Sequence, residues 1–209
     1  MKIRDFLLTK CSEDVLQGLA GQQAKVRMKA LYELFRGDPN PLVPWAPLVW
    51  NRFSRPRVSF CMWLACWDRL PLKTRLFKWG LVNDQLCVFY QAGDETRDHV
   101  FCTCSVIVPL LRRLLKLVNI NQVPCRFDEY VQMFHTSTRQ KGNVFQIRAA
   151  VLCSIIDKIW TLRNAVVFRQ EQVQVEAACR QVCSELLFRF AGFKSNRPLK
   201  SIMSKLQQF

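Results

Sequence analysis

Apolar residues recur at three- and four-residue spacing through most of this chain, whereas the alternation typical of strands is scarce. Such spacing places apolar side chains on one face of an α-helix, which can then pack onto a core. Pro71 marks the start of one short helix, and Gly142 precedes the longest pattern, of about six turns. The pattern predicts helices over residues 24–35, 58–67, 71–77, 105–119, 127–134, 145–166 and 175–190.

The arrangement of these helices suggests a fold class. Two consecutive long helices joined by few residues pack antiparallel, so we expect this of 145–166 and 175–190. Apolar residues surround 58–67, which predicts a helix buried almost all round. Residues 87–104 have no sustained period and include Gly93, as in a module built from loops. We therefore predict an all-α fold: an irregular helical domain with a small knuckle-like loop module and a C-terminal antiparallel helix pair.

The domain organisation follows from a proline-rich stretch. Four prolines lie between positions 38 and 47, which indicates an extended connector. We predict an N-terminal helical arm with this connector at 1–44, a central module at 45–120, and a C-terminal helical region with a basic tail at 121–209.

The charge balance indicates the class of partner. The chain has 31 Lys and Arg against 16 Asp and Glu, a net charge of +15. Such a charge favours a polyanion, most economically nucleic acid, although a solvated basic surface on an ordinary protein is the alternative. The cations cluster in three segments, and the candidate nucleic-acid-binding residues are Arg52, Arg55, Arg57, Lys73, Arg75, Lys78, Arg112, Arg113, Lys116, Lys194, Arg197 and Lys200.

Tryptophans lie in and beside the first of these basic segments, Arg52 to Lys78. Aromatic rings can stack on unpaired bases, but these recur with apolar neighbours, so core packing is the favoured interpretation. The residues concerned are Trp45, Trp50, Trp63, Trp67 and Trp79.

Cysteine usage and hydropathy bear on the compartment. The chain has ten cysteines, several of them inside apolar helical patterns, which favours free thiols in a reducing intracellular compartment. No apolar run reaches the ~18 residues of a membrane span. The first dozen residues resemble a transit peptide in their cations and hydroxyls, but Asp5, Glu13 and Asp14 do not fit one. Mitochondrion and nucleus both stay open.

A zinc-knuckle spacing lies in the segment from 87 to 104. A Cys-x2-Cys…His-x4-Cys knuckle needs a cysteine at position 90, where this chain has Tyr90; the remaining candidate ligands are Cys87, His99 and Cys104. Cys102 is a possible substitute. Structural zinc takes four ligands, and tyrosine is a poor replacement for thiolate, so an apolar mini-core without a cofactor is the favoured interpretation and bound zinc the alternative.

Catalytic patterns are scarce. The carboxylates are scattered, whereas two-metal nucleases and polymerases need several that converge. The sequence has no Gly-rich phosphate loop and no Gly-x-Ser-x-Gly elbow, and only His99 and His135 could act as imidazole bases. We expect no enzymatic activity and no small-molecule substrate.

Several motifs frame the knuckle. They comprise a Pro-Trp entry (Pro44, Trp45, Trp50), a Pro-x-x-x-Phe-x-x-Trp-x-Ala step (Pro56, Phe60, Trp63, Ala65), a Leu-Pro…Leu-x-x-Trp-Gly step (Leu70, Pro71, Leu76, Trp79, Gly80), the knuckle residues Glu95, Asp98, His99, Phe101 and Cys104, and the helix motif Trp160, Arg163, Asn164 and Phe168. Together, over approximately residues 24–170, they resemble the reverse-transcriptase zinc-binding region near the C-terminus of LINE-type retrotransposon polyproteins. Tyr90 departs from that family, and the polymerase and ribonuclease H carboxylates that often flank the region are missing.

The resemblance implies an accessory nucleic-acid-associated module without its enzyme, with 45–120 as the zinc-binding-like part. Combined with the charge, it leads us to expect a non-catalytic RNA-associated structural protein derived from a retroelement. Its partners would be structured RNA, such as ribosomal RNA, and neighbouring proteins of a large ribonucleoprotein such as a mitochondrial ribosome. One alternative is an accessory C-terminal fragment of a retroelement reverse transcriptase that retains zinc. Another is docking on anionic membranes through the basic tail.

Overall fold

The computed structural model describes residues 43–136, 142–194 and 197–208 of the chain. The chain divides into two units, 1–43 and 44–209, and the description below concerns the second. The helix predicted at 24–35, the N-terminal arm and most of the proline-rich connector lie outside the described residues.

The described part is helical. Its elements are α4 (Ala46–Val49), α5 (Pro56–Cys66), α6 (Lys73–Lys78), the π-helix η1 (His99–Thr103), α7 (Val108–Leu115), the 3-10 helix η2 (Lys116–Val118), α8 (Phe127–Thr136), α9 (Asn143–Arg169), α10 (Val175–Ala191) and α11 (Arg197–Leu206). Across these residues, β pairing is limited to one isolated bridge between Leu86 and Asp94. The all-α prediction is confirmed.

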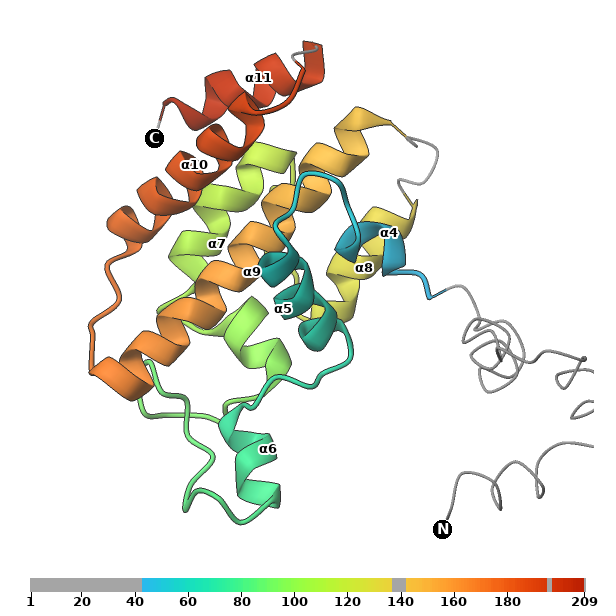
Figure 1. Cartoon of the computed structure of the whole chain (residues 1–209). Helices are drawn as coiled ribbons and strands as arrows, with labels where there is room; N and C mark the ends of the chain where they lie inside the picture. The colour runs from blue at the N-terminus through green and yellow to red at the C-terminus, as the bar shows by residue number, and fades with distance from the viewer. Residues whose placement is uncertain (1–42, 137–141, 195–196, 209) are drawn as a thin grey trace, which may run out of the picture. The chain divides into compact units, whose positions relative to one another are not determined.

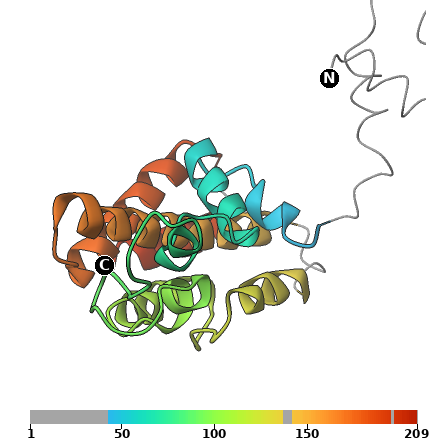
Figure 2. The same cartoon turned by 90° about the horizontal axis from the view of Figure 1, so that it is seen from below.

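Helix α9 is the centre of the core. It contacts α4, α5, α7, α10 and α11 as well as η1 and η2. Figure 2 shows α4 and α5 on one side of α9 and α7 and α8 on the other. The buried residues Ala149, Leu152, Ile156 and Ile159 follow the predicted three- and four-residue spacing. The longest apolar pattern therefore forms the element around which the others pack.

The ends of the helices have local causes. Pro56 begins α5 after Arg55, whose backbone is extended. Proline suits the first turn of a helix, because the backbone N–H that it lacks would have no hydrogen-bond partner within the helix there. Asn119 ends η2 and Gln170 ends α9, each in the left-handed conformation. Such a residue stops the helical ladder and turns the chain.

The prediction that 58–67 is buried almost all round is wrong. Val58, Met62 and Ala65 are buried against the core, but Phe60 is 53% exposed and Trp67 45% exposed. Helix α5 packs on α4 and α9, which cover one face of it and leave the outer face in solvent.

The interpretation of the tryptophans as core residues is wrong for Trp50 and Trp79, which are 58% and 59% exposed, as it is for Trp67. Trp45 and Trp63 are half-buried against the core. Trp79 directly follows α6, which has no buried residue and lies at the far end of the unit from α11 (Figure 1). Apolar neighbours in sequence therefore do not ensure burial where an element extends beyond the core.

Two elements differ from the sequence prediction. Residues 87–104 were expected to be loop throughout, but η1 forms a helical turn at 99–103. Helix α11 was predicted only as part of a basic tail, yet Leu199, Ile202 and Leu206 bury one face of it. The antiparallel arrangement of α9 and α10, which are in contact, and the divisions at 44/45 and 120/121 stay predictions. None of the described helices is long and apolar enough to cross a membrane.

Candidate metal centre and basic face

Cys87, His99 and Cys104 converge at one point. Their ligand atoms all lie within 4.8 Å of one another, and the two sulfur atoms are 3.9 Å apart. The Nε2 atom of His99 is buried and has no hydrogen-bond partner among the residues that the structure describes. Zinc prefers thiolate sulfur and imidazole nitrogen, so these donors fit a zinc ion.

The two thiols of the cluster share a hydrogen bond and ionise differently. The hydrogen bond with Cys87 lowers the pKa of Cys104 to about 7, aided by the backbone N–H groups of Val106 and Ile107 and opposed by burial. The same bond, together with burial, raises the pKa of Cys87. Because the thiolate is the form that binds metal, Cys104 can supply one near neutral pH.

Tyr90 lies beside the cluster in place of the fourth ligand. Its ring centroid is 5.5 Å from that of His99. Its hydroxyl approaches Gly93, where a Cβ atom would lie 3.1 Å away, and Gly93 has a φ of +68° that favours glycine. Burial, then Cys87 and Cys104, raises the pKa of Tyr90. The phenol therefore stays neutral and is a poor replacement for thiolate.

Cys102 does not join this cluster. It is buried within η1, and its pKa is raised first by burial and then by Asp98 and by Glu129 of α8. The charged groups that influence Cys102 therefore include a residue of α8. The structure brings together three of the four residues considered as ligands and leaves Cys102 apart.

A buried ion pair ties the knuckle to α9. The Nε and Nη2 atoms of Arg163 donate to the two carboxylate oxygens of Glu95, each at 3.0 Å. The side chains are 4% and 0% exposed. Glu95 also accepts a hydrogen bond from the backbone N–H of Lys73 at 2.6 Å, which fixes the start of α6. Glu95 and Arg163 were recognised as motif residues, but their pairing was not predicted.

Two further hydrogen bonds position η1 and α8. The Oδ1 atom of Asp98 accepts from the backbone N–H of Phe127 at 3.0 Å, at the start of α8. The hydroxyl of Tyr130 donates to the carbonyl of Phe101 at 3.1 Å in the buried core. The motif residue Asp98 therefore acts as a scaffold contact here.

The predicted cations of α5 and its approach contact other parts of the protein. Arg57 lies 2.8 Å from Asp157 of α9, whose carboxylate is almost buried. Arg55 pairs with Glu185 of α10. Arg52 lies beside the ring of Phe53, 4.6 Å from its centroid. Two of these three cations are thus paired with carboxylates.

The cations of α6 are also partly paired. Lys73 lies 2.8 Å from Asp84. Arg75 lies over the ring of Trp79 and 3.8 Å from Asp68. Lys78 is exposed at the end of α6, without a carboxylate partner among the described residues.

Cations from α7, η2 and α11 converge on one hollow, which we call the cationic hollow. Its volume is about 580 Å³, and it is lined by Arg113, Lys116, Leu117, Lys205 and Gln208. None of these lining residues is acidic. Arg113 also lies 2.9 Å from Glu176 of α10, so its charge is partly offset.

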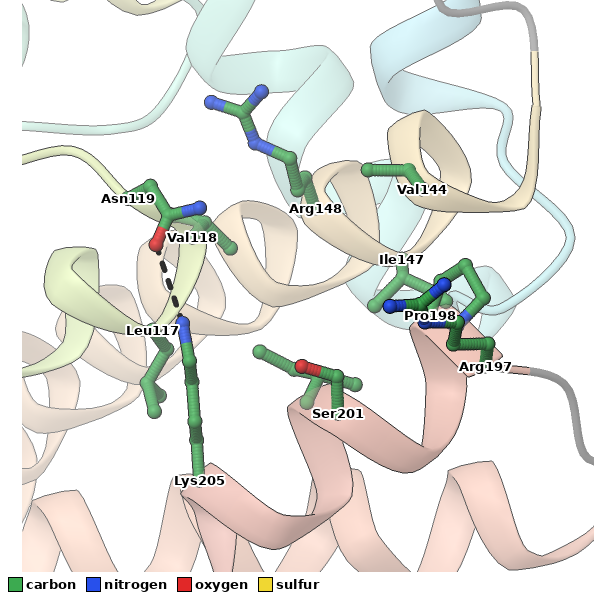
Figure 3. Close-up of a pocket in the computed structure, with 11 residues that line it drawn as sticks. Leu117, Val118, Asn119, Val144, Ile147, Arg148, Arg197, Pro198, Ser201 and Lys205 are labelled. Atoms are coloured by element: carbon green, nitrogen blue, oxygen red, sulfur yellow. Dashed lines mark hydrogen bonds between the residues drawn. The ribbon is translucent and has the colours of Figure 1, made fainter.

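A smaller hollow of about 310 Å³ adjoins the cationic hollow and shares Leu117 and Lys205 with it. We call it the η2–α11 pocket (Figure 3). The Nζ atom of Lys205 donates to Oδ1 of Asn119 at 3.2 Å across the pocket. The lining residues are Leu117, Val118, Asn119, Val144, Ile147, Arg148, Arg197, Pro198, Ser201, Ile202 and Lys205.

The sequence prediction found only part of this face. Arg113, Lys116 and Arg197 line the two hollows, whereas Arg112, Lys194 and Lys200 are exposed and line neither. Lys205, Asn119 and Arg148 were not among the predicted site residues. These three residues come together only where α11 packs against η2 and α9. The sequence offered little indication of this, because α11 was not predicted as a helix.

Comparison with known proteins concerns the candidate metal centre. No curated protein and no solved structure matches this chain. Residues 27–110 match the model of a family described as zinc-binding in reverse transcriptase. The matched residues include Cys87, His99 and Cys104 and end before every residue that lines the two hollows. The segment from 27 to 110 is therefore similar to the zinc-binding region of reverse transcriptases.

Proposed function

We propose that this chain is a non-catalytic, RNA-associated binding protein derived from a retroelement reverse transcriptase. On this proposal it contacts structured RNA within a large ribonucleoprotein, for which a mitochondrial ribosome is the example we favour. The family match supports the origin, and the basic face supports the partner.

One observation carries the proposal: the cationic hollow gathers Arg113, Lys116 and Lys205 from separate elements, and its lining contains no carboxylate. Cations held by a folded scaffold attract phosphate groups without needing exact geometry. Arg112 lies on the same helix as Arg113, is exposed and adds a further positive charge to α7.

The carboxylates near the knuckle support a non-catalytic role. Glu95 is engaged by Arg163, and Asp98 by the backbone of Phe127. Carboxylates used in this way cannot converge on two catalytic cations. The family match is to a zinc-binding region of reverse transcriptase, which supports the same proposal.

The test is the salt dependence of RNA binding by the full chain, measured by fluorescence anisotropy with a labelled stem-loop RNA. Neutralising a residue that contacts phosphate reduces the slope of log K against log salt by about one. We expect this of Lys116→Gln. Arg169→Gln removes the same charge at the end of α9, away from the hollow, and should leave the slope unchanged. If wild-type binding is insensitive to salt, or if both variants behave alike, the proposal is wrong.

The alternative, an accessory fragment of a reverse transcriptase that retains zinc, is favoured by the orphaned Nε2 of His99. Zinc would be held by the sulfur atoms of Cys87 and Cys104 and by that nitrogen, and it would cross-link the loop at 87 to η1. The ion's contribution would be structural.

The zinc content of the purified full chain, measured by atomic emission before and after dialysis against a mild chelator, distinguishes the two candidates. One zinc per chain that survives dialysis supports the alternative. Its loss in His99→Ala would place the ion in this cluster, and absence of zinc from the wild type would contradict it.

A further inference from the structure

The η2–α11 pocket differs from the cationic hollow beside it in the chemistry of its walls. Most of its lining is apolar, from η2, the first turns of α9, and α11: Leu117, Val118, Val144, Ile147, Pro198 and Ile202. Its uncharged polar groups are Asn119 and Ser201. A volume of about 310 Å³ is at the lower end of the range for small-molecule sites, so the pocket suits one small, largely apolar group.

Cations are placed at the edge of this apolar space. Figure 3 shows Lys205 reaching from α11 to Asn119, with Arg197 at the first turn of the same helix. No lining residue is acidic. Arg148 contributes its side-chain stem, and its guanidinium lies beside the ring of Phe134, 5.5 Å from the centroid. The positive charge available to a ligand therefore comes from Lys205 and Arg197.

Lys205 lines both hollows, so a ligand in the pocket is adjacent to the cationic hollow. A group with an apolar planar part and a flanking anion would place the first in the pocket and the second near Lys205 and Lys116. An unstacked nucleotide has this chemistry. Its base can also exchange hydrogen bonds with the amide of Asn119 and the hydroxyl of Ser201.

We propose that the η2–α11 pocket binds one unstacked base of single-stranded RNA, while the flanking phosphates lie in the cationic hollow. This inference rests on the proposed function and adds the form of RNA that is bound. A base inside a duplex would first have to leave its stack, which costs a few kcal/mol. Loops, bulges and single-stranded segments should therefore bind more tightly than duplexes.

The experiment compares two ligands of equal charge on the full-length protein. One is a short oligouridine RNA, and the other is an abasic oligomer with the same number of phosphates. Removing apolar surface from water contributes roughly 25 cal/mol per Å², so about 56 Å² of buried base surface gives about 1.4 kcal/mol, which is a factor of ten. We expect the wild type to bind oligouridine about tenfold more tightly than the abasic oligomer.

The variant Ser201→Phe fills the pocket from an exposed position on α11. It should remove the preference for bases and leave affinity for the abasic oligomer unchanged. Ser204→Phe is the matched control, because it is exposed on the same helix and does not line the pocket. It should keep the wild-type preference.

The outcomes separate this inference from the proposed function. If Ser201→Phe keeps the preference for bases while Lys116→Gln weakens both ligands, RNA binding stands and the pocket assignment is wrong. If the wild type shows no preference between the ligands, the pocket assignment also fails. If neither ligand binds in a salt-dependent way, the proposed function fails first.

Discussion

The knuckle and the basic face place their polar groups in opposite environments. At the knuckle, Glu95 is buried and paired with Arg163 of α9, which is buried as well. At the basic face, Lys116 and Lys205 line an open hollow that contains no acidic residue. The knuckle lies within the segment that matches the reverse-transcriptase family, and the hollows lie beyond it. Family likeness in this chain therefore describes a scaffold, and the binding surface that we propose is built by residues outside the likeness.

This difference has energetic consequences. A charge buried with its partner costs several kcal/mol when the partner is removed, because it cannot return to water. Exposed cations contribute little to folding but add to a field that reaches a Debye length into solvent. Substitutions should therefore change stability at the knuckle and RNA affinity at the basic face. The four predictions below test this separation.

The largest expected effect is at the buried ion pair. Arg163→Met should lower the free energy of unfolding by about 3–5 kcal/mol, because it leaves the carboxylate of Glu95 buried without a cation. Urea denaturation followed by circular dichroism measures this. Arg55→Met breaks the exposed pair with Glu185 and should cost at most about 1 kcal/mol. A similar loss in both variants would contradict the distinction between the sites.

The second prediction restores the missing ligand. Tyr90→Cys should increase zinc affinity at least about tenfold, because a second thiol from the loop completes a four-ligand set with Cys87, His99 and Cys104. Competition with a chromogenic chelator measures the affinity. Tyr90→Ser, which adds no thiolate, is the control. Because the cluster lies apart from the hollows, salt-dependent RNA binding should stay unchanged in Tyr90→Cys.

The third prediction concerns the basic face. The double variant Lys116→Glu with Lys205→Glu should reduce RNA affinity about tenfold at moderate salt, since it reverses two charges that line the cationic hollow. Its midpoint in urea should stay close to that of the wild type, because surface substitutions usually change stability by less than about 0.5 kcal/mol. A strong loss of stability with normal RNA binding would reverse the comparison.

The smallest effect is expected at a single hydroxyl. Tyr130→Phe removes the donor to the carbonyl of Phe101 and should cost about 1 kcal/mol, because that buried acceptor loses its partner. Tyr90→Phe is a matched substitution at a more exposed tyrosine and should be near neutral. Thermal unfolding of the two variants side by side measures the difference, and equal midpoints would argue against a role for the buried bond.

The regularity of the apolar pattern determined which helices could be predicted. Helix α9 buries a long stripe, and α10 buries Ala178, Val182 and Leu186 at helical spacing, so both were found. Helix α11 has only Leu199, Ile202 and Leu206 among lysines and an arginine, and this short stripe was interpreted as a tail. The exposure of Trp50 and Trp79 was not predicted because spacing does not show which face another element covers.

The metal cluster and the η2–α11 pocket also differed in how far they could be predicted. The convergence of Cys87, His99 and Cys104 followed from short-range spacing within one segment. The η2–α11 pocket joins residues from Leu117 to Lys205, and no spacing rule connects positions so far apart. The pair of Glu95 and Arg163 is also a long-range contact. Its members could be recognised as motif residues, whereas their partnership required the fold.

The π-helix η1 constrains the number of residues between His99 and Cys104. The backbone N–H of Cys104 donates to the carbonyl of His99, five positions earlier, at 2.8 Å. In an α-helix, residues five apart differ by about 140° around the axis, so the imidazole and the thiol would diverge. The wider π turn brings them to one side. The four residues between the histidine and the cysteine are thus a structural requirement, and deleting one of Val100 to Thr103 should disperse the cluster even with all three of its side chains intact.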